Sequence, residues 1–81
     1  MNKIKYKVIE IFNGEICFEE IFTDKNEAVN CFDMLHCNTL VDIDESDYHT
    51  VVESESDFYK VIWYKDDKEY CEEIRLIEIN E

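Results

Sequence analysis

The residues that could do chemistry in this 81-residue chain are four cysteines, two histidines and 21 acidic residues. Cysteine-based catalysis needs a thiol beside a histidine, so the candidate pairs combine Cys37 or Cys71 with His36 or His49. No glycine-rich elbow or oxyanion loop accompanies them, because Gly14 is the only glycine. Carboxylates suited to hydrolysis are so numerous that no pair stands out. The sequence therefore predicts a protein that is not an enzyme.

Metal ligation is the second chemistry that these residues suggest. Positions one, three, five and twelve of an EF-hand calcium loop are matched by Asp42, Asp44, Ser46 and Glu53. However, Asp47 stands where that loop needs glycine, and His49 stands where it needs an apolar residue. A calcium-responsive domain is kept as an alternative. For zinc, the adjacent His36 and Cys37 lack a Cys-x-x-Cys pair, and we predict no metal site and no cofactor.

The placement of charge is the most distinctive feature of the sequence. The formal net charge is −13, and no lysine or arginine lies between Lys25 and Lys60. Seven acidic residues in the stretch 42–57 are the candidate partner-binding residues: Asp42, Asp44, Glu45, Asp47, Glu53, Glu55 and Asp57. A solvated, solubilising surface explains many such runs. The functional interpretation is steering toward a basic surface, where carboxylates take the positions of phosphates.

Composition also bounds the compartment and the domain count. Cys17, Cys31, Cys37 and Cys71 are irregularly spaced, which favours reduced cysteines over a disulfide framework. The first residues carry no apolar segment of the secretory type, and no apolar run approaches the ~18 to 20 residues that span a bilayer. A chain this acidic is also unsuited to binding a nucleic-acid duplex directly. We expect one cytoplasmic domain over residues 1–81.

The elements that position these residues begin with a hairpin. Residues 3–12 alternate apolar residues with lysines and predict a strand. A phase shift near Val8 and Ile9 indicates a bulge or a strand that is apolar on both faces. Asn13-Gly14 predicts the turn, because both positions of a type I′ turn need positive φ. Residues 15–22 form the predicted return strand.

An amphipathic helix is expected next. Asp24, or alternatively Thr23, is the predicted N-cap, and Glu27 can close a capping box. The apolar stripe comprises Ala28, Val29, Cys31, Phe32 and Leu35. The helix should run to about Cys37, where Asn38 can end it. Residues 38–47 are then expected to form a loop with a short edge strand.

The remaining residues predict strands at 48–53, 58–65 and 69–79, with turns at 54–57 and 66–68. The strand at 58–65 is apolar on both faces, so it is expected at the centre. The order β-β-α-β-β-β predicts an α+β fold, an antiparallel sheet of four to five strands with the helix on one face. Five aromatic residues are candidates for the uncovered face: Tyr6, Tyr59, Trp63, Tyr64 and Tyr70. They would mark a partner or dimer surface unless long lysine and glutamate stems cover them.

The short length, the strong acidity and the lack of catalytic groups resemble phage-encoded anti-defence proteins, among them anti-CRISPR and anti-restriction inhibitors. The resemblance rests on size and charge over the whole chain, and residues 42–47 and 53–57 carry it. It implies an inhibitor that acts in the cytoplasm of a bacterial host. Many such inhibitors mimic DNA and occupy the PAM-binding or DNA-binding groove of their target enzyme.

The leading hypothesis is therefore a small acidic protein that inhibits a nucleic-acid-handling defence enzyme, such as a CRISPR effector or nuclease. It would do so by occupying the basic nucleic-acid-binding surface of that enzyme, without binding nucleic acid or membrane itself. The alternative is a self-associating structural or regulatory module, for example a homodimer formed through the open sheet face or an edge strand.

Overall fold

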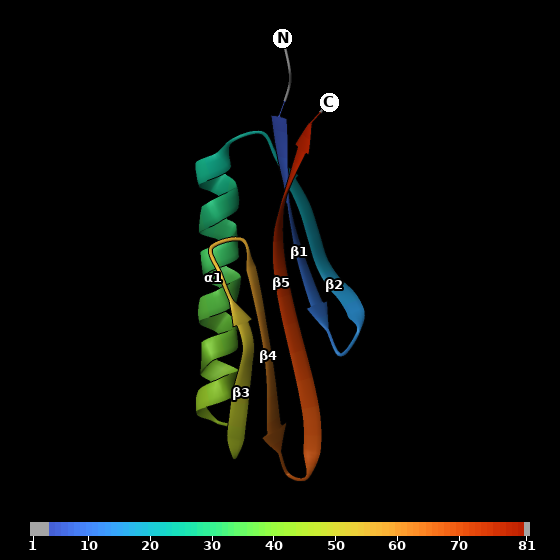
Figure 1. The fold of residues 1–81 in the computed structure, drawn as a ribbon, viewed down its shortest axis with the longest axis vertical. Coiled ribbons are helices and arrows are strands. Elements are labelled where there is room, and N and C mark those ends of the chain that lie inside the picture. The colour runs from blue at the N-terminus through green and yellow to red at the C-terminus, as the bar shows by residue number, and fades with distance from the viewer. Residues whose placement is uncertain (1–3, 81) are drawn as a thin grey trace.

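The computed structural model describes residues 4–80, which form a five-stranded antiparallel sheet with one helix on one face (Figure 1). The strands are β1 (Ile4–Phe12), β2 (Glu15–Phe22), β3 (Tyr48–Ser54), β4 (Phe58–Lys65) and β5 (Lys68–Asn80), and helix α1 spans Lys25–Asp44. The spatial order is β2-β1-β5-β4-β3, and the principal extents are 52 × 20 × 17 Å. The predicted α+β fold and element order are confirmed.

The first hairpin closes at Asn13 and Gly14, whose φ angles of 51° and 85° fit the predicted type I′ turn. Asn13 also ties this turn to β5, because its N–H donates to the Cys71 carbonyl at 2.8 Å and its Oδ1 accepts from the Cys71 N–H at 2.9 Å. The register of β1 against β2 shifts between Glu10 and Ile11, and not at Val8 and Ile9 as the sequence suggested. The phase shift in β1 instead reflects a strand that is paired on both sides and apolar on both faces.

Helix α1 begins as predicted, with the Asp24 side chain accepting a hydrogen bond from the Asn26 N–H at 2.8 Å. The prediction of its end was wrong, because the helix continues past Asn38 to Asp44 and residues 38–47 contain no strand. Its buried stripe extends through Thr39 and Ile43. The Thr39 hydroxyl is satisfied by donating to the Leu35 carbonyl at 3.0 Å. Polar Thr39 and the surrounding acids concealed this second half of the helix in the sequence.

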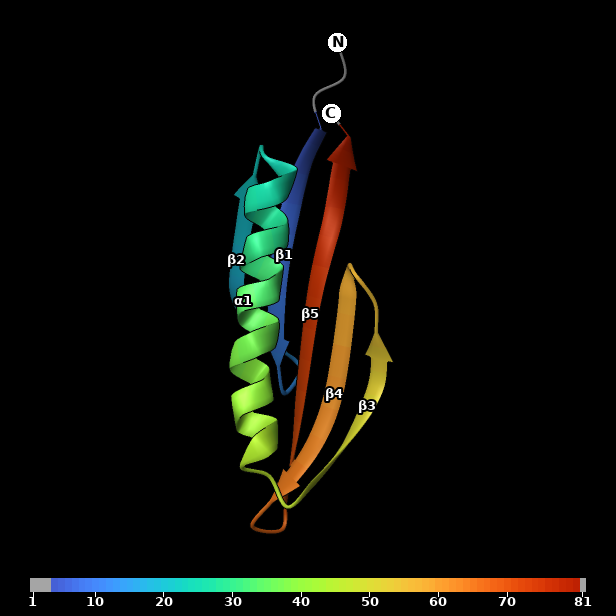
Figure 2. The same cartoon turned by 90° about the vertical axis from the view of Figure 1, so that its left-hand side faces the viewer.

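The three later strands lie within two residues of their predicted bounds, but their order differs from expectation. The centre of the sheet is β5 and not β4, since the 13-residue β5 pairs with β1 on one side and with β4 on the other. Strand β3 forms one edge, and all seven of its residues are exposed. Helix α1 lies over β1, β2 and β5 and its side chains reach the buried row of β4, while β3 forms the far edge (Figure 2).

The core lies between α1 and the sheet. Because paired residues of antiparallel strands share a face, Tyr59, Val61 and Trp63 of β4 lie in rows with Tyr70, Glu72 and Ile74 of β5. Those rows face α1, and Tyr59 and Trp63 are only 3% and 4% exposed. The prediction that the aromatic residues line the uncovered face was therefore wrong for all but one of them. Only Tyr64 lies there, while Tyr6 shares the side of Val8.

Candidate functional site

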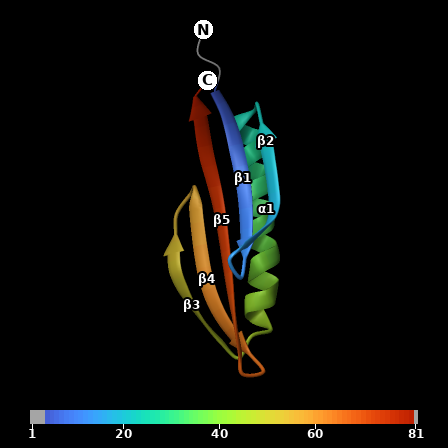
Figure 3. The same ribbon diagram turned by 90° about the vertical axis from the view of Figure 1, so that its right-hand side faces the viewer.

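The two sides of the sheet differ sharply in charge. Residues 4–80 hold 20 acidic and seven basic residues, because Lys3 and Glu81 lie outside the described residues. We call the side opposite α1 the open face, and Figure 3 views the sheet from that side. Strand register assigns it four basic residues and four acidic residues: Lys5, Lys7, Lys60 and Arg75, and Glu19, Glu53, Glu69 and Glu73. The open face is therefore neutral, and the net charge lies on the helix, the helix side of the sheet and the turns.

The charges of the open face are largely satisfied among themselves. Arg75 Nε lies 2.8 Å from a Glu73 carboxylate oxygen, and the Arg75 guanidinium lies 5.4 Å from the centre of the Phe58 ring. Lys7 pairs with Glu19 at 3.2 Å. The Glu69 carboxylate accepts a hydrogen bond from the Tyr64 hydroxyl at 2.8 Å, and this bond raises the pKa of Tyr64.

On the acidic side, three chain segments meet at one end of the molecule. We call this surface the acidic end, and it comprises Asp42, Asp44, Glu45, Asp47, Asp66 and Asp67. Asp47 joins the segments, because its N–H donates to the Tyr64 carbonyl at 2.8 Å and its Oδ2 accepts from the Asp66 N–H at 3.1 Å. Four of the seven predicted partner-binding residues are thus brought together. Asp66 and Asp67 join them because the β4–β5 turn lies beside the end of α1 (Figure 1).

The other three predicted residues lie elsewhere. Glu53 is near the end of β3, and Glu55 and Asp57 are in the β3–β4 turn. The seven-residue strand β3 separates them from the acidic end by about 20 Å at ~3.3 Å per residue. The seven residues therefore form two surfaces, and not the single one that their spacing in the sequence suggested.

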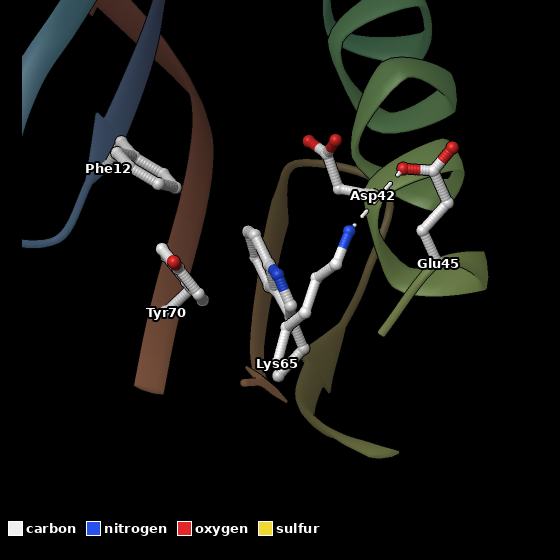
Figure 4. Close-up of a pocket in the computed structure, with 6 residues that line it drawn as sticks. Phe12, Asp42, Glu45, Lys65 and Tyr70 are labelled. Carbon is white, nitrogen blue, oxygen red and sulfur yellow. Dashed lines mark ion pairs between the residues drawn. The ribbon is translucent and has the colours of Figure 1, made fainter. Parts of the chain in front are cut away.

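A cavity of about 210 Å³ opens beside the acidic end. It is lined by Phe12, Asp42, Glu45, Trp63, Lys65 and Tyr70, and we call it the aromatic pocket. The centres of its three aromatic rings lie 5.7 to 6.1 Å apart. Asp42 and Glu45 lie at the end of the helix, across the pocket from Phe12 and Tyr70, and Lys65 Nζ lies 3.9 Å from a Glu45 carboxylate oxygen (Figure 4). A second cavity, of about 370 Å³, lies toward the other end between Tyr6, Lys25, Asp57 and Glu78.

Beneath the helix lies an acidic residue that the sequence did not single out. Glu72 is 5% exposed, in the row between Phe12 and Val61, and its Oε1 has no hydrogen-bond partner. Burial raises its pKa to about 9, aided by a hydrogen bond with Glu10 and by the negative charges of Glu10 and Asp42. Glu72 is therefore protonated at neutral pH. Its alternation with Tyr70 and Ile74 in an otherwise apolar row was the signal that could have revealed it.

The acidic residues at the end of α1 oppose the helix that carries them. A helix C-terminus bears partial negative charge and favours cations, yet the last turn of α1 holds Asp42 and Asp44 and no basic residue. Glu45 adds a further carboxylate at the C-cap. Such placement costs about 0.3 to 1 kcal/mol for each charge. Residues that break a local rule in this way are expected mainly at functional sites.

The other chemistries considered from the sequence are not assembled. The His36 ring packs on Tyr59 at 4.1 Å on the helix side, whereas Cys71 lies on the open face, so the sheet separates them. His36 lies in the middle part of the helix, because α1 extends to Asp44. Of the EF-hand match, Asp42 and Asp44 are helical, and Glu53 lies along β3. Residues 4–80 contain no cluster of three or more His, Cys, Asp or Glu side chains that could hold a metal ion.

All four cysteines are free thiols. Cys31 is buried in the core, and burial raises the pKa of its thiol. Cys17 is exposed, but its Sγ lies 3.2 Å from Glu10 Oε1, and partial burial together with that carboxylate raises its pKa to about 11. A thiol with so high a pKa is a poor nucleophile at neutral pH.

Among the described residues, the one helix is too polar to cross a membrane. The chain matches no protein-family model, and searches of the curated proteins and of the solved structures found no similar protein.

Proposed function

We propose that this protein binds the basic nucleic-acid-binding surface of a nucleic-acid-handling enzyme, such as a CRISPR effector or nuclease, and thereby inhibits it. The observation that carries the proposal is that the net charge of this elongated molecule lies off the open face, on the helix, the helix side of the sheet and the turns. A net charge of −13 over 52 Å is about one charge per 4 Å. A nucleic-acid strand carries about one charge per 3.4 Å. This protein thus approaches the charge density of a single nucleic-acid strand and has a little under half that of a duplex, which carries about one charge per 1.7 Å.

Three residues of the acidic end support the proposal because their charges destabilise the end of the helix. Asp42, Asp44 and Glu45 lie where the helix dipole favours cations. Functional sites commonly retain residues at a cost in stability. A partner's arginines and lysines would relieve this repulsion, so binding would stabilise the helix end.

The aromatic pocket would supply the anchor of this interaction. Exposed carboxylates speed the association of two proteins and orient them, whereas buried contacts around an arginine or aromatic residue provide affinity. An arginine of the partner would enter between Asp42 and Glu45 and lie against the ring of Tyr70. Lys65 now occupies the rim beside Glu45 and would have to move aside. Substitution Lys65→Met is therefore expected to strengthen binding, and Tyr70→Ala to weaken it.

Charge reversal at the acidic end tests the site. The variant Asp42→Lys, Asp44→Lys, Glu45→Lys leaves Asp47 in place, since Asp47 holds the β4–β5 turn. Inhibition should be lost while the far-UV circular dichroism stays unchanged. The matched control reverses Glu53, Glu55 and Asp57 on the second surface and should retain most of the inhibition. Equal inhibition by wild type and by the first variant would contradict the proposal.

The target can be sought by capture from bacterial lysates that contain defence systems, with and without excess duplex DNA. We expect a nuclease or CRISPR effector to be captured and DNA to displace it. Capture that DNA does not affect would place binding outside the nucleic-acid groove and would contradict mimicry. Recovery of this protein with no other protein bound to it would contradict the proposal and favour the self-associating module instead.

A further inference from the structure

We propose that two copies of this chain pack open face to open face, in antiparallel orientation, to form a homodimer. The proposal does not rest on the function proposed above. It rests on the apolar content of the open face, its neutrality, the distribution of its charges along the molecule and its area.

The open face is apolar and uncovered within the part of the chain that the structure describes. Strand register places ten large apolar or aromatic residues on it: Ile9, Ile11, Ile16, Ile21, Ile62, Ile77, Ile79, Tyr48, Phe58 and Tyr64. Tyr48 is 61% exposed, Ile21 is 55% exposed and Ile77 is 38% exposed. Tyr48 and Tyr64 stack on each other with their ring centres 4.5 Å apart. Exposed apolar residues gathered on one face of a globular domain typically mark an interface.

A second copy is the occupant because the face is neutral and self-complementary. Two chains of net charge −13 repel each other over most of their surfaces. Contact through the open face keeps the two acidic sides outward, on opposite outer surfaces of the dimer. A twofold axis makes the same face serve both partners, as an isologous interface requires.

The distribution of charge along β5 selects the antiparallel orientation. Lys5 and Lys7 lie beside Ile79 and Ile77, near one end of the strand, whereas Glu69 lies at the other end. Arg75 and Glu73 flank the midpoint between these ends. Antiparallel packing places Lys5 of each copy near Glu69 of the other and Arg75 near Glu73. Parallel packing would place like charges together and is disfavoured.

The face is large enough for a stable dimer. Its five strands hold 45 residues, which at about 3.3 Å by 4.8 Å for each residue give about 700 Å². Standard interfaces bury about 800 Å² on each partner. Two sheets packed face to face lie about 10 Å apart, so the interdigitated side chains would form a second core.

Sedimentation equilibrium at tens of micromolar protein tests the assembly, run at two salt concentrations where the Debye length is about 8 Å and about 3 Å. We expect twice the monomer mass of 9.8 kDa at both concentrations, with tighter association at high salt. The variant Ile62→Lys, Ile77→Glu keeps the net charge and should sediment as a monomer. The control Leu40→Lys, Val41→Glu, on exposed positions of α1, should remain a dimer.

A charge exchange tests the orientation. Lys5→Glu alone and Glu69→Lys alone should each weaken dimerisation about tenfold or more, because each places like charges together at two symmetric positions. The two substitutions combined should restore it. A wild-type monomer, or a dimer that survives the Ile62 and Ile77 substitutions, would overturn the proposal. A dimer unaffected by both single charge changes would overturn its antiparallel arrangement.

Discussion

The two sides of this sheet treat charge in opposite ways. The open face carries four basic and four acidic residues, and close pairs such as Arg75 with Glu73 largely cancel each other's electric field. On the helix side, carboxylates gather at a helix C-terminus that repels them, and one lies buried beneath the helix. The acidic residues are therefore not spread evenly over the surface, as they would be if they served only solubility. The excess negative charge lies on the helix, the helix side of the sheet and the turns, at a cost in stability. The open face, by contrast, carries equal numbers of acidic and basic residues.

The largest difference that we expect is between two neighbouring residues of β5, Glu72 and Glu73, in how each makes stability depend on pH. Glu72 faces the helix with a pKa raised to about 9 from its ordinary 4.5, while Glu73 faces the opposite way and pairs with Arg75. The folded chain holds the Glu72 proton more tightly than the unfolded chain does. This stabilisation is therefore complete below pH 4.5 and declines as the pH rises toward 9, with a slope of up to about 1.4 kcal/mol per pH unit.

The variant Glu72→Gln should remove this slope and stabilise the protein at pH 8, because a neutral amide needs no proton. The matched Glu73→Gln variant should keep the slope and lose some stability. Urea unfolding of each protein between pH 7 and pH 9 measures both effects. A wild-type stability that is flat over this interval would contradict the assignment of Glu72.

Charge reversal at the C-terminal end of α1 should give the next largest change in the free energy of unfolding. Asp42→Lys together with Asp44→Lys places cations where the helix dipole favours them and should raise the free energy of unfolding by about 1 to 2 kcal/mol. Added salt should raise the melting temperature of the wild type more than that of this variant, since salt screens the repulsion that the variant lacks. Destabilisation of the double variant would show that these acids serve the fold.

The β1–β2 and β4–β5 hairpin turns differ in how well their residues suit a left-handed backbone. Asn13-Gly14 suits its left-handed backbone, whereas Asp66 and Asp67, at the acidic end, adopt φ of 53° and 63° without glycine. Substitution Asp67→Gly should therefore stabilise by about 1 kcal/mol, or about 4 to 8 °C in Tm. Gly14→Ala should destabilise by a similar amount, because an alanine is strained at a φ of 85° even though space is available for its Cβ. Thermal unfolding of both variants measures the pair.

The smallest effect is expected on the open face. Arg75→Gln removes the ion pair with Glu73 and the contact with Phe58, and exposed contacts of these kinds contribute about 0.5 to 1 kcal/mol each at most. The loss should shrink at high salt, in contrast to the salt response of the acidic end. Urea unfolding in low and high salt measures it, and a loss that grew with salt would contradict the picture of a paired, neutral face.

Local signals predicted most of this fold, and tertiary signals were missed. Asn13-Gly14, the Asp24 cap and the strand alternation act over a few residues, so the elements and their order could be predicted. The second half of α1 could not, because the buried side of the helix includes the polar Thr39, whose hydroxyl donates to the Leu35 carbonyl. The sheet order depends on the pairing of β1 with β5, which leaves no local trace.

The candidate site, too, could be predicted only where the signal is local in the sequence. The acids of residues 42–47 were identified from their density, but their meeting with Asp66 and Asp67 depends on where the β4–β5 turn lies. The aromatic residues were placed on the wrong side because an alternating strand does not reveal which of its two rows faces the helix. The position of α1 decides that row, and it buries Tyr59 and Trp63.

The pairing of β1 with β5 also has a kinetic consequence. It joins Ile4 to Asn80, the first and last described residues, and continues to Phe12 and Glu72, so residues far apart in the sequence meet at the centre of the sheet. The β1–β2 hairpin and the β3–β4–β5 meander are local, but neither has a complete sheet until these strands meet. Contacts between such distant residues are slow to form, since the loop must close before they stabilise it. During synthesis the domain therefore has to wait for β5, and a nascent chain that ends before β5 lacks the strand that joins its two halves.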